Sequence, residues 1–247
     1  MKPPLEPQFP LKCEHYISQK FGEQSSVYTS GFHLGLDIVP TENGAFFPAP
    51  VYAILDGTLR YFYETQPTTQ GITNSKAIAV DTWLDDDFIT YLKGLGKVPP
   101  QLNKVRLMHS YLHGLEILDK DGTIDQITPI MKCGNTGMVF SGGVPVPEEE
   151  KGVPPYKGGH LHLQCELYRE DNILIGFIDP EIILGYNQGE LMTNSQFVHK
   201  QGTSEYGFFL PATTEDSLKD KALNLGLEIA NPDGTVNFGL AKEISGL

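Results

Sequence analysis

Four residues able to bind a metal ion occur in two short, glycine-flanked motifs. His33 and Asp37 stand four positions apart in one motif, and His160 and His162 stand two positions apart in the other. In an extended chain, residues i, i+2 and i+4 point to one face, so each motif presents its side chains together. If the two strands are neighbours, two imidazoles and a carboxylate can bind Zn²⁺ and leave a fourth position for water. The third imidazole is then free for proton transfer.

Either motif alone is also compatible with a purely structural pair of side chains. Their joint occurrence, more than a hundred residues apart and each flanked by glycine, favours a metal site. The other histidines include His15 and His199, which have no partner at ligand spacing.

The composition excludes several classes of protein. The chain has 247 residues, with 18 Lys and Arg against 31 Asp and Glu, and its net charge of −13 argues against binding to nucleic acid. At 40% hydrophobic residues it can form a real core. It has no apolar run long enough to span a membrane, and prolines replace the apolar part of a signal peptide, so we expect no membrane insertion and no export signal. Three cysteines cannot close a disulfide framework, and we expect Cys13, Cys133 and Cys165 to be mostly buried thiols.

Short apolar runs bounded by Gly and Pro predict a mainly β domain over residues 1–190. The predicted strands cover residues 35–38, 50–54, 57–63, 77–81, 105–112, 127–133, 160–168 and 172–175. Residues 85–95 predict a small inserted helix, because apolar side chains recur at helical spacing behind an acidic first turn that complements the helix dipole. Residues 65–75 and 141–159 are expected to be loops. Beyond residue 190 we expect a small α+β C-terminal region (191–247), with a strand at 206–210, a helix from 213 or 214 to 225 and a hairpin near 231–234.

A series of motifs, in a fixed order, resembles the lysostaphin-type, LytM-like zinc metallopeptidases that cut the peptide part of peptidoglycan. The resemblance covers residues 18–180, about two thirds of the chain. It implies an antiparallel β-sheet or sandwich peptidase domain with a groove. The motifs are Ser18-Gln-Lys-Phe-Gly22, Phe32-His-Leu-Gly-Leu-Asp-Ile38, Pro50-Val-Tyr-Ala-Ile-Leu-Asp-Gly-Thr-Leu59, Gly134-Asn-Thr-Gly137, His160-Leu-His-Leu163 and Ile178-Asp-Pro180.

Carried over position by position, the resemblance makes His33, Asp37 and His162 the zinc ligands. It makes His160 a catalytic histidine. No other cofactor is implied.

The family uses a second catalytic histidine, in a Tyr-X-His context before the GxTG turn. His109 and His113 compete for that role. They stand four apart in one predicted strand, so periodicity places both on one face and does not choose between them. Tyr111-Leu-His113 supplies the tyrosine of the motif, which favours His113 and leaves His109 as the alternative.

The resemblance implies a zinc metalloendopeptidase that hydrolyses peptide bonds of peptidoglycan cross-bridges or stem peptides. Such a protein acts at the bacterial cell wall, reached by phage release, as part of a virion or after processing of a longer chain; otherwise the chain is cytoplasmic. The alternative is a catalytically inactive LytM-like module that binds the wall or activates other enzymes, since a fold does not guarantee its usual chemistry. Metal content distinguishes the two.

Two long segments depart from the family pattern. Residues 83–104 and 138–159 replace short connections, and loops of this size commonly build the walls of a binding cleft. Trp83 and Tyr91 lie in the first segment, where we expect them to pack the small helix more readily than to line the groove.

Overall fold

The computed structural model describes residues 5–24, 31–64, 66–68, 71–73 and 75–186. Within them the protein is mainly β, as the sequence predicts. The strand, helix and hairpin predicted after residue 190, together with His199, lie outside the described residues, so the boundary at residue 190 stays a prediction. None of the described helices has the length and apolar composition needed to cross a membrane.

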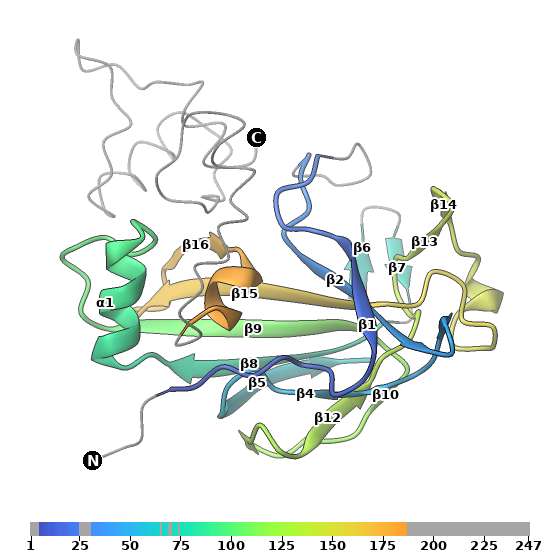
Figure 1. Ribbon diagram of the computed structural model, residues 1–247, viewed down its shortest axis with the longest axis horizontal. Coiled ribbons are helices and arrows are strands. Elements are labelled where there is room, and N and C mark those ends of the chain that lie inside the picture. Colours follow the sequence, from blue (N-terminus) through green and yellow to red (C-terminus); the bar gives the residue numbers. More distant parts are fainter. Residues whose placement is uncertain (1–4, 25–30, 65, 69–70, 74, 187–247) are drawn as a thin grey trace, which may run out of the picture.

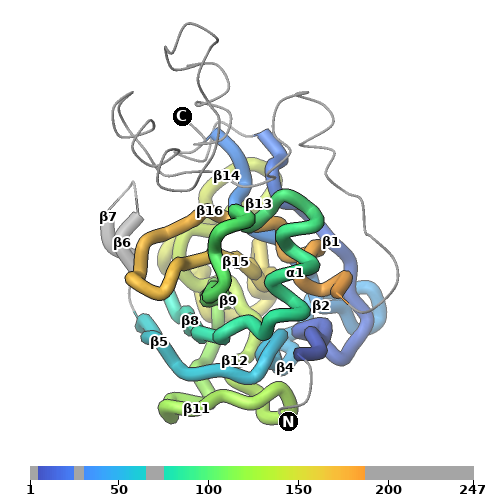
Figure 2. The backbone as a smooth tube through the Cα atoms, turned by 90° about the vertical axis from the view of Figure 1, so that its left-hand side faces the viewer, coloured from blue at the N-terminus to red at the C-terminus, as the bar shows by residue number. Residues whose placement is uncertain are grey.

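The main sheet is antiparallel throughout its described pairs and follows the order β1-β2-β15-β9-β8-β5-β11, with β3 beside β2 and β16 beside β15 (Figure 1). A smaller sheet has the order β10-β12-β4, and both views place β4 and β12 below β9 and β15 (Figure 1, Figure 2). The strands of the main sheet are β1 (His15–Gln19), β2 (Gly35–Glu42), β3 (Ala45–Phe46), β5 (Gly57–Tyr63), β8 (Lys76–Trp83), β9 (Val105–Gly114), β11 (Thr123–Ile124), β15 (Leu161–Arg169) and β16 (Leu174–Ile178), and those of the smaller sheet are β4 (Pro50–Tyr52), β10 (Glu116–Ile117) and β12 (Pro129–Lys132).

The alternation of side chains along β15 separates the core from the opposite face of the sheet. Leu161, Leu163 and Cys165 are fully buried and belong to one hydrophobic cluster with residues of β4 and β12, such as Val51 and Met131. The intervening side chains of β15 therefore point away from that core. His162 falls on one of these positions and His160 directly precedes the strand in the same alternation, so the pattern that builds the core also turns both histidines toward the other face.

Helix α1 (Asp86–Gly94) confirms the predicted insertion. The Asp85 side chain caps it by accepting a hydrogen bond from the backbone N–H of Phe88 (2.8 Å), and Tyr91 packs against Phe88. Trp83 is 44% exposed at the end of β8, where the Nζ of Lys104 lies 5.1 Å from its ring centroid. Tyr91 thus packs the helix as expected, whereas Trp83 pairs with a lysine.

Two segments expected to be loops contain short strands. Residues 65–75 include the hairpin of β6 (Gln66–Thr68) and β7 (Gly71–Thr73). Residues 141–159 include the hairpin of β13 (Phe140–Ser141) and β14 (Val144–Pro145) and the 3-10 turn η1 (Glu148–Glu150). The second hairpin turns at Gly142 and Gly143, whose positive φ angles of 60° and 79° match the turn that favours a two-residue hairpin. Strand β1 and helix α2 (Pro180–Leu184) are further elements that the sequence analysis missed.

The three cysteines are free thiols. Cys133 and Cys165 are fully buried, as expected, whereas Cys13 is only partly buried.

Candidate metal centre

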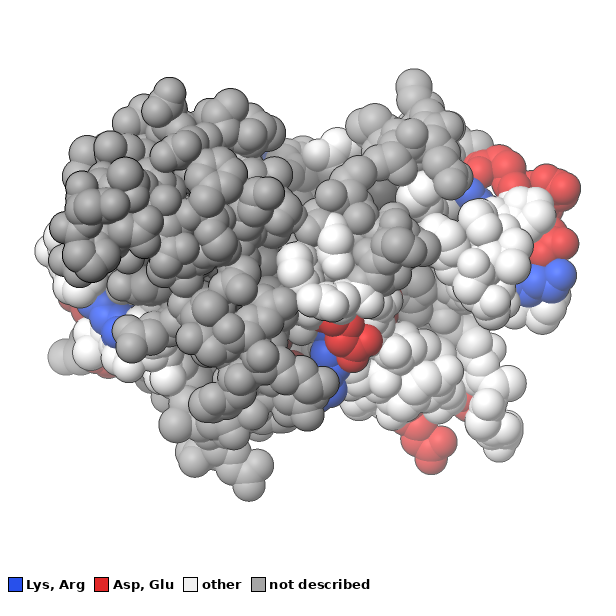
Figure 3. All heavy atoms as spheres, turned by 90° about the horizontal axis from the view of Figure 1, so that it is seen from above, with Lys and Arg blue, Asp and Glu red and all other residues white. Residues whose placement is uncertain are grey.

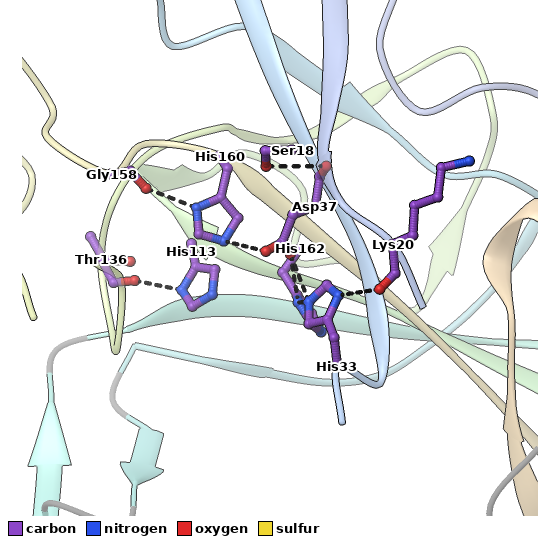
Figure 4. A network of polar contacts seen from close by, with 9 residues as sticks. All are labelled: Ser18, Lys20, His33, Asp37, His113, Thr136, Gly158, His160 and His162. Atoms are coloured by element: carbon purple, nitrogen blue, oxygen red, sulfur yellow. Dashed lines mark hydrogen bonds and ion pairs between the residues drawn. The ribbon is translucent and has the colours of Figure 1, made fainter. Parts of the chain in front are cut away.

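Strands β2 and β15 bring the two metal-binding motifs together. Asp37 and His162 are directly opposite each other in the β2–β15 pair, and His33 lies just before β2. The Nε2 of His33 is 3.0 Å from the Nδ1 of His162 and 3.0 Å from the Oδ1 of Asp37, and that oxygen is 2.9 Å from the Nδ1 of His162 (Figure 4). Three ligand atoms therefore form a nearly equilateral triangle at a buried position.

Gly35 allows this approach. A Cβ atom at this position would stand 2.5 Å from the Nε2 of His162 and 2.6 Å from the carbonyl oxygen of Leu163. Both distances are too short for real atoms, so only glycine leaves room for the imidazole to lie over β2.

Backbone carbonyl groups determine the tautomers of three histidines. The Nδ1 of His33 donates to the carbonyl oxygen of Lys20 (3.1 Å), that of His160 to Gly158 (2.8 Å) and that of His113 to Thr136 (2.8 Å) (Figure 4). A carbonyl oxygen can only accept, so each of these Nδ1 atoms carries the proton and each Nε2 keeps a lone pair. Such outer hydrogen bonds are the usual means of orienting a metal-binding imidazole.

The donor set fits a divalent cation. In neutral His33 the lone pair on Nε2 faces the carboxylate of Asp37 at 3.0 Å, so this contact is favourable only when a proton or a metal cation lies between the two atoms. A tetrahedral zinc ion with bonds of about 2.0–2.1 Å requires its ligand atoms to be about 3.3 Å apart, slightly more than the 2.9–3.0 Å in this triangle. Small side-chain shifts close that difference. Among the described residues, these three form the one group of His, Cys, Asp and Glu with the geometry of a metal site.

The electrostatics favour the protonation states that bind metals. Although burial alone raises the pKa of Asp37, the nearby charge of His160 and the hydrogen bonds of His162 and His33 lower it well below its usual value. Burial lowers the pKa of His162, against the opposing effect of Asp37. Burial, followed by the charges of His160 and His162, lowers the pKa of His113 well below its usual value. A carboxylate and neutral imidazoles are the forms that metal binding requires.

A β-bulge places His113 beside this site. Residues 112 and 113 of β9 together oppose the single residue Ala77 of β8, and His113 has a φ angle of +66°. In a regular strand His113 would point to the core like Tyr111, but the bulge turns its ring toward His160, with 4.7 Å between the ring centroids. The expectation that His109 and His113 share a face is therefore wrong, because it assumes an unbroken strand.

His109 remains on the core side of β9. Its Nε2 lies 3.0 Å from the Thr82 hydroxyl and its Nδ1 lies 2.7 Å from the Tyr111 hydroxyl, which in turn accepts a hydrogen bond from the backbone N–H of Ile54 (2.7 Å). The side chain is fully buried, and burial lowers its pKa to about 3. His109 thus serves a buried hydrogen-bond chain and does not reach the metal centre.

A groove of about 600 Å³ opens over the histidines. Its base contains Asp37, His113, His160 and His162. One wall comes from β1, β2 and β3, and the other from residues 138–142 and 155–159. The inserted segment 138–159 therefore builds a groove wall, as predicted, whereas no residue of segment 83–104 lines this groove.

Asn135 ties the inserted wall to the turn at residues 134–137. Its side-chain NH₂ group donates to the carbonyl oxygens of Glu150 (3.2 Å) and Lys157 (3.0 Å), and its side-chain oxygen accepts from the N–H of Gly152 (2.7 Å). The same turn accepts the His160 backbone N–H at the Gly134 carbonyl (3.0 Å). One short turn thus holds the wall and one of the histidines that border the groove.

No family model matches the chain, and no curated protein matches it. Distant likenesses exist among solved structures. A zinc-containing peptidase from Vibrio cholerae is 18% identical with a TM-score of 0.41, and the match covers 71% of this chain and 39% of that one. Lysostaphin from Staphylococcus simulans is 18% identical with a TM-score of 0.40, and the match covers 73% of this chain and 55% of that one. The match to the SpoIIQ–SpoIIIAH pore-forming complex has 16% identity and a TM-score of 0.40, and it covers 72% of this chain and 89% of that one. The chain thus spans about two fifths of the Vibrio protein, and likenesses at this level decide neither family nor activity.

The residues that the sequence analysis missed act through their main chains. The carbonyl groups of Lys20, Thr136 and Gly158 orient three imidazoles. Every residue carries a carbonyl group, so no residue type could have indicated them. Asn135 belongs to the Gly134–Gly137 turn motif, but the motif does not indicate that its side chain binds the inserted segment.

Proposed function

We propose that this chain is a zinc metalloendopeptidase that hydrolyses peptide bonds of peptidoglycan cross-bridges or stem peptides at the bacterial cell wall. The observation that carries the proposal is the triangle of ligand atoms from His33, Asp37 and His162, of which Asp37 and His162 line an open groove. Three protein ligands with an open fourth position distinguish catalytic from structural zinc sites.

His33, Asp37 and His162 would hold the ion. When bound, zinc polarises the scissile carbonyl and supplies a nucleophile at neutral pH. His160 and His113 border the groove beside these ligands, and their Nδ1 protons are committed to backbone carbonyl groups. Their Nε2 atoms are therefore the ones that accept a proton from the attacking water, hydrogen-bond the developing oxyanion after protonation, and return the proton to the leaving amine.

The local charge of the groove is more compatible with an anionic cell wall than the net charge of the whole protein is. Among the described residues that line it, the charged ones are Asp37, which the metal would neutralise, and Lys157. At the end of the molecule that carries β13 and β14, acidic and basic side chains lie next to each other, as in the pairs Lys151–Glu148 (2.8 Å) and Lys157–Glu150 (2.9 Å) (Figure 3). The excess negative charge is therefore not concentrated in the groove, and a wall polymer meets less repulsion there.

Zinc content and amino-group release from cell walls test the proposal. We expect about one zinc per chain and release of new amino groups from purified peptidoglycan that stops with a chelator and resumes with added zinc. Walls with different cross-bridges and stem peptides, compared with Gly-Gly peptides, identify the bond. A stable protein that holds no zinc and releases no amino groups would instead be an inactive wall-binding or activator module.

A further inference from the structure

A turn at residues 20–23 holds the metal ligand His33 on three sides. The Lys20 carbonyl oxygen accepts the ring Nδ1–H (3.1 Å), the backbone N–H of Gly22 donates to the His33 carbonyl (2.7 Å), and the His33 backbone N–H donates to the Glu23 carbonyl (2.9 Å). The orientation of the imidazole therefore depends on where this turn lies.

The turn is fastened to helix α2 by one ion pair. The Nζ of Lys20 lies 3.2 Å from both carboxylate oxygens of Glu181, a residue 161 positions later in the chain. The Glu181 side chain is 9% exposed and that of Lys20 is 38% exposed. In the close-up, the Lys20 carbonyl points to His33 while its side chain extends away from the metal centre (Figure 4). One residue thus contacts the ligand through its backbone and α2 through its side chain.

Glu181 has little freedom to follow a displaced lysine. Its backbone N–H donates to the side chain of Asp179 (2.9 Å), which caps α2, and Pro180 occupies the first helical position. Its carboxylate is nearly buried, and a buried charge that loses its partner carries a large desolvation cost. The carboxylate therefore holds the ammonium group of Lys20 at a fixed point.

We propose that Glu181 is a positioning residue for the metal centre, because through Lys20 it fixes the carbonyl group that orients His33. The proposal rests on the proposed zinc site. Partners outside the first ligand shell typically contribute 10- to 100-fold in metal affinity. Glu181 acts on His33 only through Lys20, so we expect its replacement to weaken zinc binding by an amount at the lower end of that range.

The test measures the zinc dissociation constant of the full chain by competition with a chelator, without any peptidase assay. Glu181→Gln and Lys20→Met should each weaken zinc binding by about 10-fold. Lys20→Arg should bind zinc within about 3-fold of wild type, because its guanidinium can pair with both oxygens of Glu181. Glu170→Gln is the matched charge control: it removes one carboxylate from the exposed Lys104–Glu170 pair, eight positions beyond His162. It should leave zinc affinity unchanged.

The unfolding midpoint of the metal-free variants separates positioning from stability. Lys20 is partly exposed, so Lys20→Met decides the matter if Glu181→Gln does not fold. Zinc affinity that falls in Lys20→Met and is retained in Lys20→Arg supports the inference. If wild type binds one zinc while Glu181→Gln and Lys20→Met bind it as tightly and lose only unfolding stability, the inference is wrong and the proposed function stands. A wild-type chain that binds no zinc overturns both.

Discussion

Replacing His162 and His160 separately with alanine tests the proposed division of labour at the metal centre. His162 provides one of the three ligand atoms, each 2.9–3.0 Å from the other two. Structural zinc sites with four protein ligands bind with about 10–16 kcal/mol, so one ligand corresponds to about 2.5–4 kcal/mol. His162→Ala should therefore weaken zinc binding by about 10²–10³-fold and abolish activity at limiting zinc.

His160→Ala should behave differently. The His160 Nε2 lies 3.5 Å from the outer oxygen of Asp37 and is not part of the triangle. We expect zinc content to stay near wild type while turnover falls by about 10²–10⁴-fold, the usual contribution of proton transfer.

Metal analysis after gel filtration, beside rates of amino-group release at saturating zinc, measures both effects. The reasoning is refuted if His160→Ala loses its zinc while His162→Ala keeps it. Retention of zinc and full activity in both variants would show that this is not the catalytic site.

Further predictions concern Gly35, Asn135 and His109. Gly35→Ala should lower zinc content at a folding cost of about 1–3 kcal/mol, because its Cβ would overlap the His162 ring; inductively coupled plasma mass spectrometry and urea unfolding measure the two effects. Asn135→Ala should lower the free energy of unfolding by about 2–4 kcal/mol, because it breaks three hydrogen bonds of a buried amide, and it should raise KM more than it changes kcat. Steady-state kinetics on a soluble wall peptide measure both constants, and an unchanged KM would contradict this prediction. The pKa of His109 is lowered to about 3 in the folded state, so its contribution to stability is complete above pH 6.5 and is lost as the pH falls. Urea unfolding of the metal-free protein should show up to about 3 kcal/mol less stability at pH 4 than at pH 6.5 because of His109. His109→Gln should lack this contribution to the pH dependence.

Regular periodicity explains why much of the site could be predicted. The alternation of β15 separates Leu161 and Leu163 from the histidines, and the pairing of Asp37 with His162 follows once β2 and β15 are neighbours. Helix α1 was predictable because its cap, Asp85, and its apolar spacing are local properties of the sequence.

Features that depend on distant partners could not be predicted. Whether β9 continues straight through His113 depends on how many residues its neighbour β8 places opposite, and the sequence of β9 does not contain that number. The partner of Glu181 lies 161 positions away, and surface and buried carboxylates look alike in a sequence. Strand β1 is short and mostly exposed, so it lacks the apolar alternation by which a strand is recognised.

The bulge in β9 shows how the proposed catalysis could be lost in evolution without the loss of any residue of the candidate site. One inserted residue beside Ala77 would give β8 the length to pair with both Leu112 and His113, and the regular strand would then turn the histidine under the sheet. Every proposed ligand and both proposed catalytic histidines would still appear in an alignment. Inactive descendants of this chain would be found by comparing the lengths of two neighbouring strands, whereas a search for missing histidines would pass over them.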